Sequence, residues 1–204
     1  MNYNQLPSKK IVEKTMTALK GHNITPYFVN TKKEALAKIK KLIPDGGEVM
    51  TGSSTTLDQI GFVDLLKSGK HPWKNLKDAI VAEKDPAKQS ELRKKSILSD
   101  YFLGSVHAIT QDGQVLIASA SGSQIPSYSF SSDNVIWVAG AHKIVPTLED
   151  ALIRIKDYVF PLEDKRMKSV GMFGSNISKI LIFQKEIMPN RHIHLILVNE
   201  VLGF

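Results

Sequence analysis

Three short segments of small and polar residues could bind an anion. They combine backbone N–H groups with hydroxyl, amide, imidazole and ammonium groups, and their candidate ligand-binding residues are Gly52, Ser53, Ser54, Thr55 and Thr56; Ser119, Gly122, Ser123 and Gln124; and Gly140, His142 and Lys143. The first segment follows a predicted strand and precedes a predicted helix, where unpaired N–H groups favour phosphate or carboxylate. It lacks the lysine of a Walker P-loop and the glycine spacing of a dinucleotide site. Helix capping by Ser54 or Thr55 explains its composition equally well.

The other two segments point to the same chemistry less specifically. The Ser119–Gln124 segment is uncharged and follows an apolar strand, a position where α/β sheets commonly bind ligands. An ordinary flexible connection explains it as well. Lys143 would supply a positive charge beside an anion, and His142 would donate a hydrogen bond or move a proton. Taken singly, each of these two fits a surface loop better than a site.

The remaining chemical groups define no catalytic centre. His192 and His194 face the same side of a predicted strand, but no third ligand is identifiable nearby, so we predict no metal site. His107 and Glu200 are conceivable bases that nothing in the sequence connects to the first loop. The chain has no cysteine. This excludes disulfides, thiolate nucleophiles and cysteine-ligated zinc or iron–sulfur clusters.

Helices and apolar strands alternate along the chain and would position these loops. Apolar runs bounded by turn residues predict strands at 24–29, 48–51, 106–110, 114–118, 134–139, 180–183 and 193–198. Helical spacing and caps predict helices at 8–19, from Thr31 to Ile43, after Leu57, from Asp85 to Phe102, and from Thr147 to Pro161. The stretch 67–77 is polar and is predicted to be a surface loop. Such alternation is typical of an α/β fold with a helix-covered, mixed, largely parallel sheet, into which the Asp112-Gly113 turn inserts a β-hairpin.

Size and composition fit an ordinary globular protein. The 204 residues, 42% of them hydrophobic, suit one domain, with a helical part at 1–45 and a core at 46–204. The sequence shows no signal peptide and no apolar run of membrane-spanning length, so we expect a cytoplasmic protein. A net charge of +7 favours anionic partners, but acidic residues are interleaved with the lysines and no nucleic-acid-binding motif accompanies them. We therefore expect a small anionic molecule as partner, not nucleic acid.

Five segments, in the same order along the chain, resemble the LUD-domain (lactate utilisation, DUF162) family. They are Thr51–Gly61, Phe102–Gly113, Val138–Val145, Pro161–Arg166 and His194–Phe204. The resemblance implies a fold of the NagB/RpiA/CoA transferase-like group, whose members bind sugar phosphates, CoA thioesters or related anions at loops after sheet strands. It also implies a connection to lactate oxidation beside iron–sulfur partner proteins. Many members carry a cysteine-rich segment where this chain has Met167–Asn176, so any cluster-bearing role of that segment is lost here.

Three functional hypotheses follow. The first is a metabolic LUD protein that binds an organic acid, sugar phosphate or CoA ester; no resident cofactor is identifiable, and a CoA ester or phosphorylated compound would be the ligand. The second is an isomerase or acyl/CoA-transferase-type enzyme of the same fold group, which needs a positioned base or nucleophile. The third is a ligand-sensing or scaffold module for redox partners, which would self-associate, for example as a homo-oligomer, or capture redox subunits.

Overall fold

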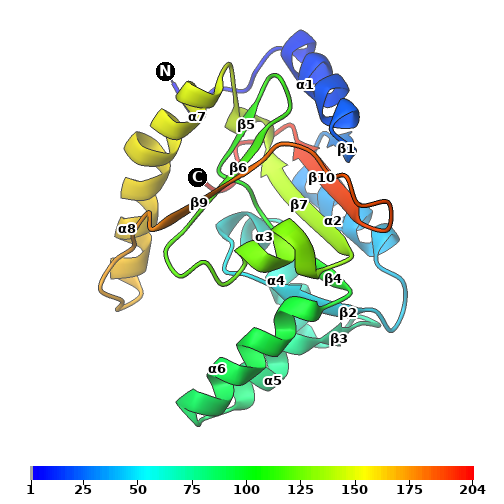
Figure 1. Cartoon of the computed structure of the whole chain (residues 1–204), viewed down its shortest axis with the longest axis vertical. Helices are drawn as coiled ribbons and strands as arrows, with labels where there is room; N and C mark the ends of the chain where they lie inside the picture. Colours follow the sequence, from blue (N-terminus) through cyan, green and yellow to red (C-terminus); the bar gives the residue numbers. More distant parts are fainter. Residues whose placement is uncertain (1) are drawn as a thin grey trace.

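A six-stranded parallel sheet forms the centre of the molecule (Figure 1). The computed structural model describes residues 2–204. The strands follow one another across the sheet in the order β1 (Ile24–Val29), β10 (His192–Val198), β7 (Asn134–Gly140), β4 (Tyr101–Gly104), β2 (Glu48–Thr51) and β3 (Lys74–Asn75). All neighbouring pairs are parallel, so the carboxyl ends of the strands lie along one edge. The predicted α/β class with a largely parallel, helix-covered sheet is confirmed.

Both faces of this sheet are buried, which explains the uninterrupted apolar runs of β7 and β10. Along β7, Val135, Trp137 and Ala139 pack into one core cluster, whereas Ile136 and Val138 pack into the other. This alternation follows from the two-residue repeat of a strand. Side chains on both faces therefore had to be apolar, as in other sheets covered on both sides.

Helices on one face complete the second of these clusters. They are α2 (Lys32–Leu42), α3 (Thr55–Gln59) and α4 (Phe62–Ser68), which contribute Ala35, Ile39, Leu57, Phe62 and Leu66. Helix α2 begins as predicted, because Thr31 accepts a hydrogen bond from the backbone N–H of Glu34. The opposite face is covered by α1 (Lys9–Gly21), through Val12 and Leu19, and by a second sheet.

The predicted hairpin belongs to this second, smaller sheet. Its strand order is β8 (Ile144–Val145), β5 (Ala108–Thr110), β6 (Val115–Ser119) and β9 (Lys179–Phe183). Strands β5 and β6 pair antiparallel, and Gly113 in the connecting turn has a φ of 92°. The outer side of the small sheet packs against α7 (Leu148–Arg154) and the π-helical turn Ile155–Val159. Helix α8 (Phe160–Ser169) continues directly from that turn. The helices α2 to α4, the parallel sheet, the small sheet and α7 with this turn thus form four successive layers.

Three local predictions were wrong. Helix α6 (Pro86–Lys95) starts at the predicted Asp85 cap but ends before Phe102, which lies in β4. The stretch 67–77 contains the edge strand β3 and the buried Trp73, whose indole N–H donates to the carbonyl of Ile43 at 3.3 Å. Pro161 does not end the helical region, because the π-helical turn Ile155–Val159 leads directly into α8 and lets the helix continue past a residue that lacks an N–H.

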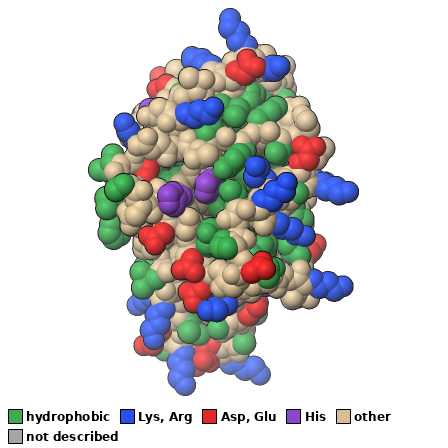
Figure 2. Space-filling view, turned by 90° about the vertical axis from the view of Figure 1, so that its right-hand side faces the viewer, with side chains coloured by type: hydrophobic (Ala, Val, Ile, Leu, Met, Phe, Trp, Pro, Cys, Tyr) green, Lys and Arg blue, Asp and Glu red, His purple; other side chains and the backbone are tan. Residues whose placement is uncertain are grey.

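Two helices project from the body of the molecule. They are α5 (Leu76–Ala82) and α6, which lie together at the lower end of the view in Figure 1. Lysine and arginine side chains are scattered among acidic ones on the face in Figure 2, which agrees with a solvated surface. Within residues 2–204, no helix is both long enough and apolar enough to cross a membrane.

Candidate functional site

A cavity of about 500 Å³ opens at the carboxyl ends of β2, β4 and β7. Its walls combine these strand ends with β6 of the small sheet and with α8. Nine of the predicted ligand-binding residues line it, namely Gly52, Ser53, Ser54, Thr55, Thr56, Ser119, Ser123, Gln124 and Lys143. The fold thus brings together three segments that are far apart in the sequence.

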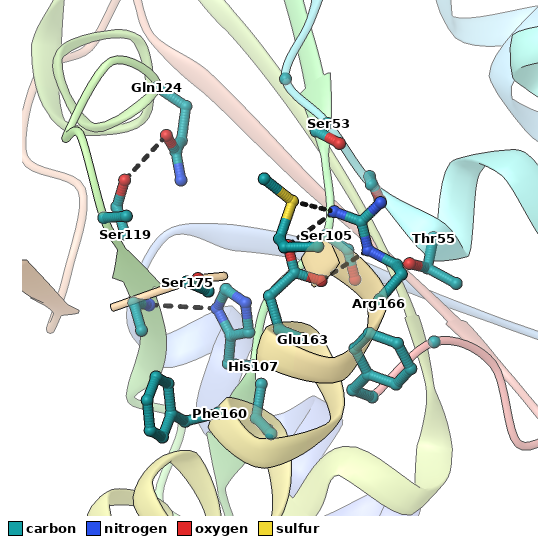
Figure 3. Close-up of a pocket in the computed structure, with 18 of the residues that line it drawn as sticks. Ser53, Thr55, Ser105, His107, Ser119, Gln124, Phe160, Glu163, Arg166 and Ser175 are labelled. Atoms are coloured by element: carbon teal, nitrogen blue, oxygen red, sulfur yellow. Dashed lines mark hydrogen bonds and ion pairs between the residues drawn. The ribbon is translucent and has the colours of Figure 1, made fainter. Parts of the chain in front are cut away.

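The first loop combines a helix cap with side chains that face the cavity. The Ser54 hydroxyl accepts a hydrogen bond from the backbone N–H of Leu57 at 3.2 Å, so it caps α3. Helix α3 has only five residues, so its dipole contributes little to anion binding. In the described chain, the hydroxyls of Ser53 and Thr55 have no hydrogen-bond partner, and both side chains lie at the cavity in Figure 3. They are the side-chain donors that this loop offers.

Lys143 lies at the floor of the cavity and is only 2% exposed. Its ammonium nitrogen Nζ is 3.3 Å from Thr56 Oγ1, 3.1 Å from Ser105 Oγ and 3.1 Å from the carbonyl oxygen of Val106. All three partners are neutral, and no carboxylate within residues 2–204 forms an ion pair with it. Burial, and secondarily the charge of Arg154, hold the pKa of Lys143 well below its usual value.

A second buried cation, Arg154, lies close enough to Lys143 for its charge to lower the pKa of Lys143. Arg154 is fully buried; its Nη1 donates to the carbonyl of His107, whereas its Nε and Nη2 have no partner in the described chain. The rings of Tyr158 and Tyr3 flank its guanidinium at 5.1 and 5.5 Å. Burial lowers the pKa of Arg154 to about 10, so it stays charged at neutral pH. The field behind the cavity floor is therefore positive.

His142 and Gly140 shape this region without lining the cavity. Burial lowers the pKa of His142 to about 3, against a smaller opposing effect of the Glu200 backbone, so its ring is neutral. A Cβ atom on Gly140 would lie 2.5 Å from the carbonyl oxygen of Glu200 and 2.6 Å from His142 Nδ1. Gly140 makes room for these protein groups, and not for a ligand.

The second loop is organised by its own hydrogen bonds. Ser119 Oγ donates to Gln124 Oε1 at 3.0 Å and accepts from the backbone N–H of Gly122 at 2.9 Å (Figure 3). Gly122 has a φ of 85°, and a Cβ there would lie 2.6 Å from Lys179 Cδ. Gly122 is thus needed for the turn and is not among the residues that line the cavity. The turn leaves the amide nitrogen of Gln124 available to a ligand.

Of the two conceivable bases, His107 lines the cavity and Glu200 does not. Glu200 Oε1 accepts from the backbone N–H of Lys32 at 2.9 Å. His107 Nδ1 accepts from the backbone N–H of Ala118 at 3.0 Å, so in the neutral ring Nε2 carries the proton. Burial lowers the pKa of His107 to about 3. At neutral pH His107 can donate a hydrogen bond but is a poor base.

His194 of β10 contacts the neighbouring strand β1. Its Nδ1 lies 3.3 Å from the Tyr27 hydroxyl. In the described part of the chain, no group of three or more histidine, aspartate or glutamate side chains is arranged to hold a metal ion.

Several lining residues were missed in the sequence. Arg166 and Glu163 of α8 form a bidentate ion pair with N···O distances of 2.7 and 2.6 Å (Figure 3). The hydrogen bond to Glu163 raises the pKa of Arg166. Both residues fall in the Pro161–Arg166 segment that resembled the family, which was the only signal for them. Ser105 directly follows β4, and a correctly predicted strand there would have identified it.

Comparisons with known proteins agree with this architecture. A model of the LUD domain matches residues 12–198. The crystal structure of a DUF162 family protein from Deinococcus radiodurans is similar at a TM-score of 0.55 and 11% sequence identity, covering 96% of this chain and 100% of that one. That likeness concerns the fold alone. No curated protein matches the chain. Because the domain match spans most of the sequence, the chain belongs to the LUD-domain family.

Proposed function

We propose that this LUD-domain protein is a metabolic protein that binds a small organic anion in the cavity, with lactate or another 2-hydroxy acid as the simplest candidate. The supporting observation is the buried ammonium group of Lys143, which has only neutral partners. A buried cation without a counter-ion is costly to the folded protein. A carboxylate or phosphate beside Nζ would offset that cost.

Binding at Lys143 would be linked to proton uptake. Because burial holds the pKa of Lys143 low in the empty cavity, part of the population is neutral at alkaline pH. A bound anion stabilises the ammonium form and so raises this pKa. The affinity for the anion should therefore decrease as the pH rises above the pKa of the empty site, by up to about tenfold per pH unit.

The other lining groups determine what is attached to the anion. The hydroxyls of Ser53, Thr55 and Ser105 and the Nε2 proton of His107 can donate to ligand oxygens. Apolar side chains of Ile155, Val159 and Phe160 form part of the wall. A cavity of about 500 Å³ is large for lactate alone, so organic acids with additional groups, sugar phosphates and part of a CoA ester also fit the proposal.

Isothermal titration calorimetry tests the proposal. The purified protein is titrated with lactate, a sugar phosphate and a CoA ester, and the proton uptake is read from buffers of different ionisation enthalpy. Binding of at least one anion with proton uptake at alkaline pH is expected. Lys143→Met should abolish binding, whereas the exposed Lys156→Met should not. Full affinity in Lys143→Met, or no binding of any anion by the wild type, would overturn the proposal.

An isomerase of the same fold group is the second candidate. The observation that favours it is that His107, a proton donor, and Lys143, an amine whose pKa is lowered by burial, line the same cavity. Together they could polarise a carbonyl and remove a proton from the adjacent carbon. Proton exchange with D2O at that carbon, followed by NMR on 2-oxo acids and sugar phosphates, should then depend on Lys143. Absence of exchange with every bound ligand would argue against this candidate.

A further inference from the structure

A second cavity of about 300 Å³ adjoins the first. The two cavities share five lining residues, namely Gly52, Ser53, Arg93, Ser123 and Gln124. At the shared boundary, a Cβ atom placed on Gly52 would have only Gln124 Cβ nearby, at 3.7 Å. The boundary thus runs between the first loop and the second loop, where Gly52 contributes no side chain to block it. A ligand in one cavity can extend into the other.

The second cavity is lined by two cations and by no acidic residue. Lys77 Nζ donates to Thr51 Oγ1 at 3.3 Å and to the carbonyl oxygen of Gly52 at 3.4 Å. Arg93 donates through Nη2 to Gln89 Oε1 at 3.0 Å. Neither has an ion-pair partner within residues 2–204. Burial, followed by the charges of Arg93 and Lys67, lowers the pKa of Lys77, as expected for neighbouring cations without a counter-ion.

Much of the remaining lining of this cavity is apolar. It includes Met50, Ile80, Ile97 and Phe102, from β2, α5, the turn after α6, and β4. A site that combines cations with hydrocarbon suits an anionic group attached to an aliphatic or ring-containing segment. A free inorganic ion would use only half of these contacts.

We propose that the second cavity holds a second anionic group of the same ligand. The ligand is then an elongated dianion, with one group at Lys143 and a second carboxylate or phosphate at Lys77 and Arg93. This inference rests on the proposed function, because it extends the ligand from the first site. It narrows the ligand class to compounds longer than lactate with a charged group at each end. Two linked anions also bind more tightly than separate ones, because the second contact becomes intramolecular.

A series of straight-chain dicarboxylates from malonate to suberate tests which separation of two anionic groups matches the two sites. Each is compared by calorimetry with the monocarboxylate of the same length, and with a hydroxy acid that carries a terminal phosphate. At one length the second anionic group should improve affinity roughly tenfold or more over the monocarboxylate. A larger gain from phosphate than from carboxylate would identify a phosphorylated ligand, and the reverse a dicarboxylic acid.

Variants assign that gain to the second cavity. Lys77→Met and Arg93→Met should each remove most of it. Lys77→Met should also leave monocarboxylate binding unchanged, because Lys77 lines only the second cavity. Lys94→Met is the matched control, since Lys94 is exposed on the same helix as Arg93 and lines neither cavity. Lys77→Gln, which keeps a donor toward Gly52, provides a second variant should the methionine disturb folding.

The outcomes separate this inference from the proposed function. If neither the monocarboxylates nor the dianions bind the wild type, the proposed function itself fails. If monocarboxylates bind through Lys143 but no second anionic group improves affinity at any length, only the present inference is overturned. The same holds if the gain persists in the Lys77→Met, Arg93→Met double variant. Loss of the gain in both single variants, with Lys94→Met unaffected, supports the second site.

Discussion

Two buried cations lie at opposite ends of the parallel sheet and are treated very differently by the fold. Arg191 precedes β10 at the amino ends of the strands, and Lys143 follows β7 at the carboxyl ends. Arg191 forms an ion pair with Glu186 at 2.5 Å and donates to carbonyl oxygens of Ser127, Tyr128, Ser129 and Ser132. The second oxygen of Glu186 accepts from the backbone N–H groups of Ile187 and Met188.

Lys143 has no such set of partners, although it is as deeply buried as Arg191. Behind it, Arg154 retains two nitrogens without partners in the described chain. A cation that only stabilises the fold gains from being matched by a carboxylate and by carbonyls. Leaving a cation unmatched at the carboxyl ends of parallel strands, beside a cavity, is costly unless a ligand completes it. The amino end is therefore structural, and the carboxyl end is where binding is expected.

The same substitution at the two cations should give the largest difference in stability. Arg191→Met leaves the buried Glu186 without a counter-ion and removes the donor to four carbonyls. The free energy of unfolding should therefore fall by about 3 to 5 kcal/mol. Lys143→Met leaves Thr56 Oγ1 hydrogen-bonded to Ser105 Oγ, and Ser105 Oγ to the Val106 carbonyl. The free energy of unfolding should therefore change by no more than about 1 kcal/mol, since no buried charge loses its counter-ion. Urea denaturation at neutral pH measures both.

Lys185→Met is the control for the first variant, because Lys185 is exposed and lies next to Glu186. Equal losses in Arg191→Met and Lys143→Met would mean that Lys143 is a structural residue like Arg191. That result would remove the physical basis for a ligand at the carboxyl ends of the strands.

Much of the fold could be predicted because strands buried on both faces of the sheet have continuous apolar sequences. The runs at β7 and β10 are apolar at every position that packs into either core cluster, so their strands were recognised. Strand β3 has only two residues, too few to show a repeat. Strand β4 follows a helix without a glycine or proline between them, whereas the equally short β2 follows Pro44, Gly46 and Gly47. The place of β3 and β4 in the sheet depends on parallel pairing with β2, which is a long-range contact.

The site was predictable only in part for a related reason. Loops of small residues after strands were visible in the sequence, and nine of the twelve predicted residues line the cavity. The other three predicted residues have structural roles. Gly122 allows a turn, Gly140 allows a close backbone contact, and His142 is a buried neutral ring. Arg93, Glu163 and Arg166 lie on helices that reach the cavity only through the tertiary arrangement. Helical spacing therefore did not mark them, and the family resemblance of Pro161–Arg166 was the only signal for Glu163 and Arg166.

The two neutral histidines of the carboxyl end should make the folded protein sensitive to acid. The pKa values of His107 and His142 are lowered to about 3, whereas an unfolded histidine titrates near 6.5. As the pH falls from 6.5 toward 3, the unfolded chain binds protons that the folded protein does not, so stability decreases. Each histidine should contribute a loss of about 1.4 kcal/mol per pH unit once the pH is well below 6.5.

His107→Asn tests this assignment because an asparagine oxygen can still accept from the Ala118 N–H. The variant should lose about half of the slope of unfolding free energy against pH between pH 6 and 4, some 2 kcal/mol over that interval. The exposed His192→Asn should leave the slope unchanged. A wild-type protein whose stability does not decline over this interval would show that these histidines are protonated in the fold.

The smallest effect on stability is expected at Gly52, where the fold does not require a glycine. Its φ is not in the left-handed region, and an added Cβ would meet only Gln124 Cβ at an ordinary contact distance of 3.7 Å. Gly52→Ala should therefore change the free energy of unfolding by less than about 0.5 kcal/mol. Gly203 contrasts with it, because its φ is 66° and a Cβ would lie 2.2 Å from Thr56 Oγ1. Gly203→Ala should cost more than about 1 kcal/mol in the same denaturation experiment.

Ligand affinity then decides what Gly52 is for. If an elongated ligand passes the boundary between the two cavities, the added methyl group of Gly52→Ala narrows its path, and dianion affinity should fall while monocarboxylate affinity is kept. Ser123→Ala, on the other side of the same boundary, removes atoms instead of adding them and should not obstruct the path. Unchanged dianion affinity in Gly52→Ala would mean that the ligand does not cross here. Because the fold does not require a glycine at position 52, a change in dianion affinity in this variant would report on the path of the ligand and not on folding.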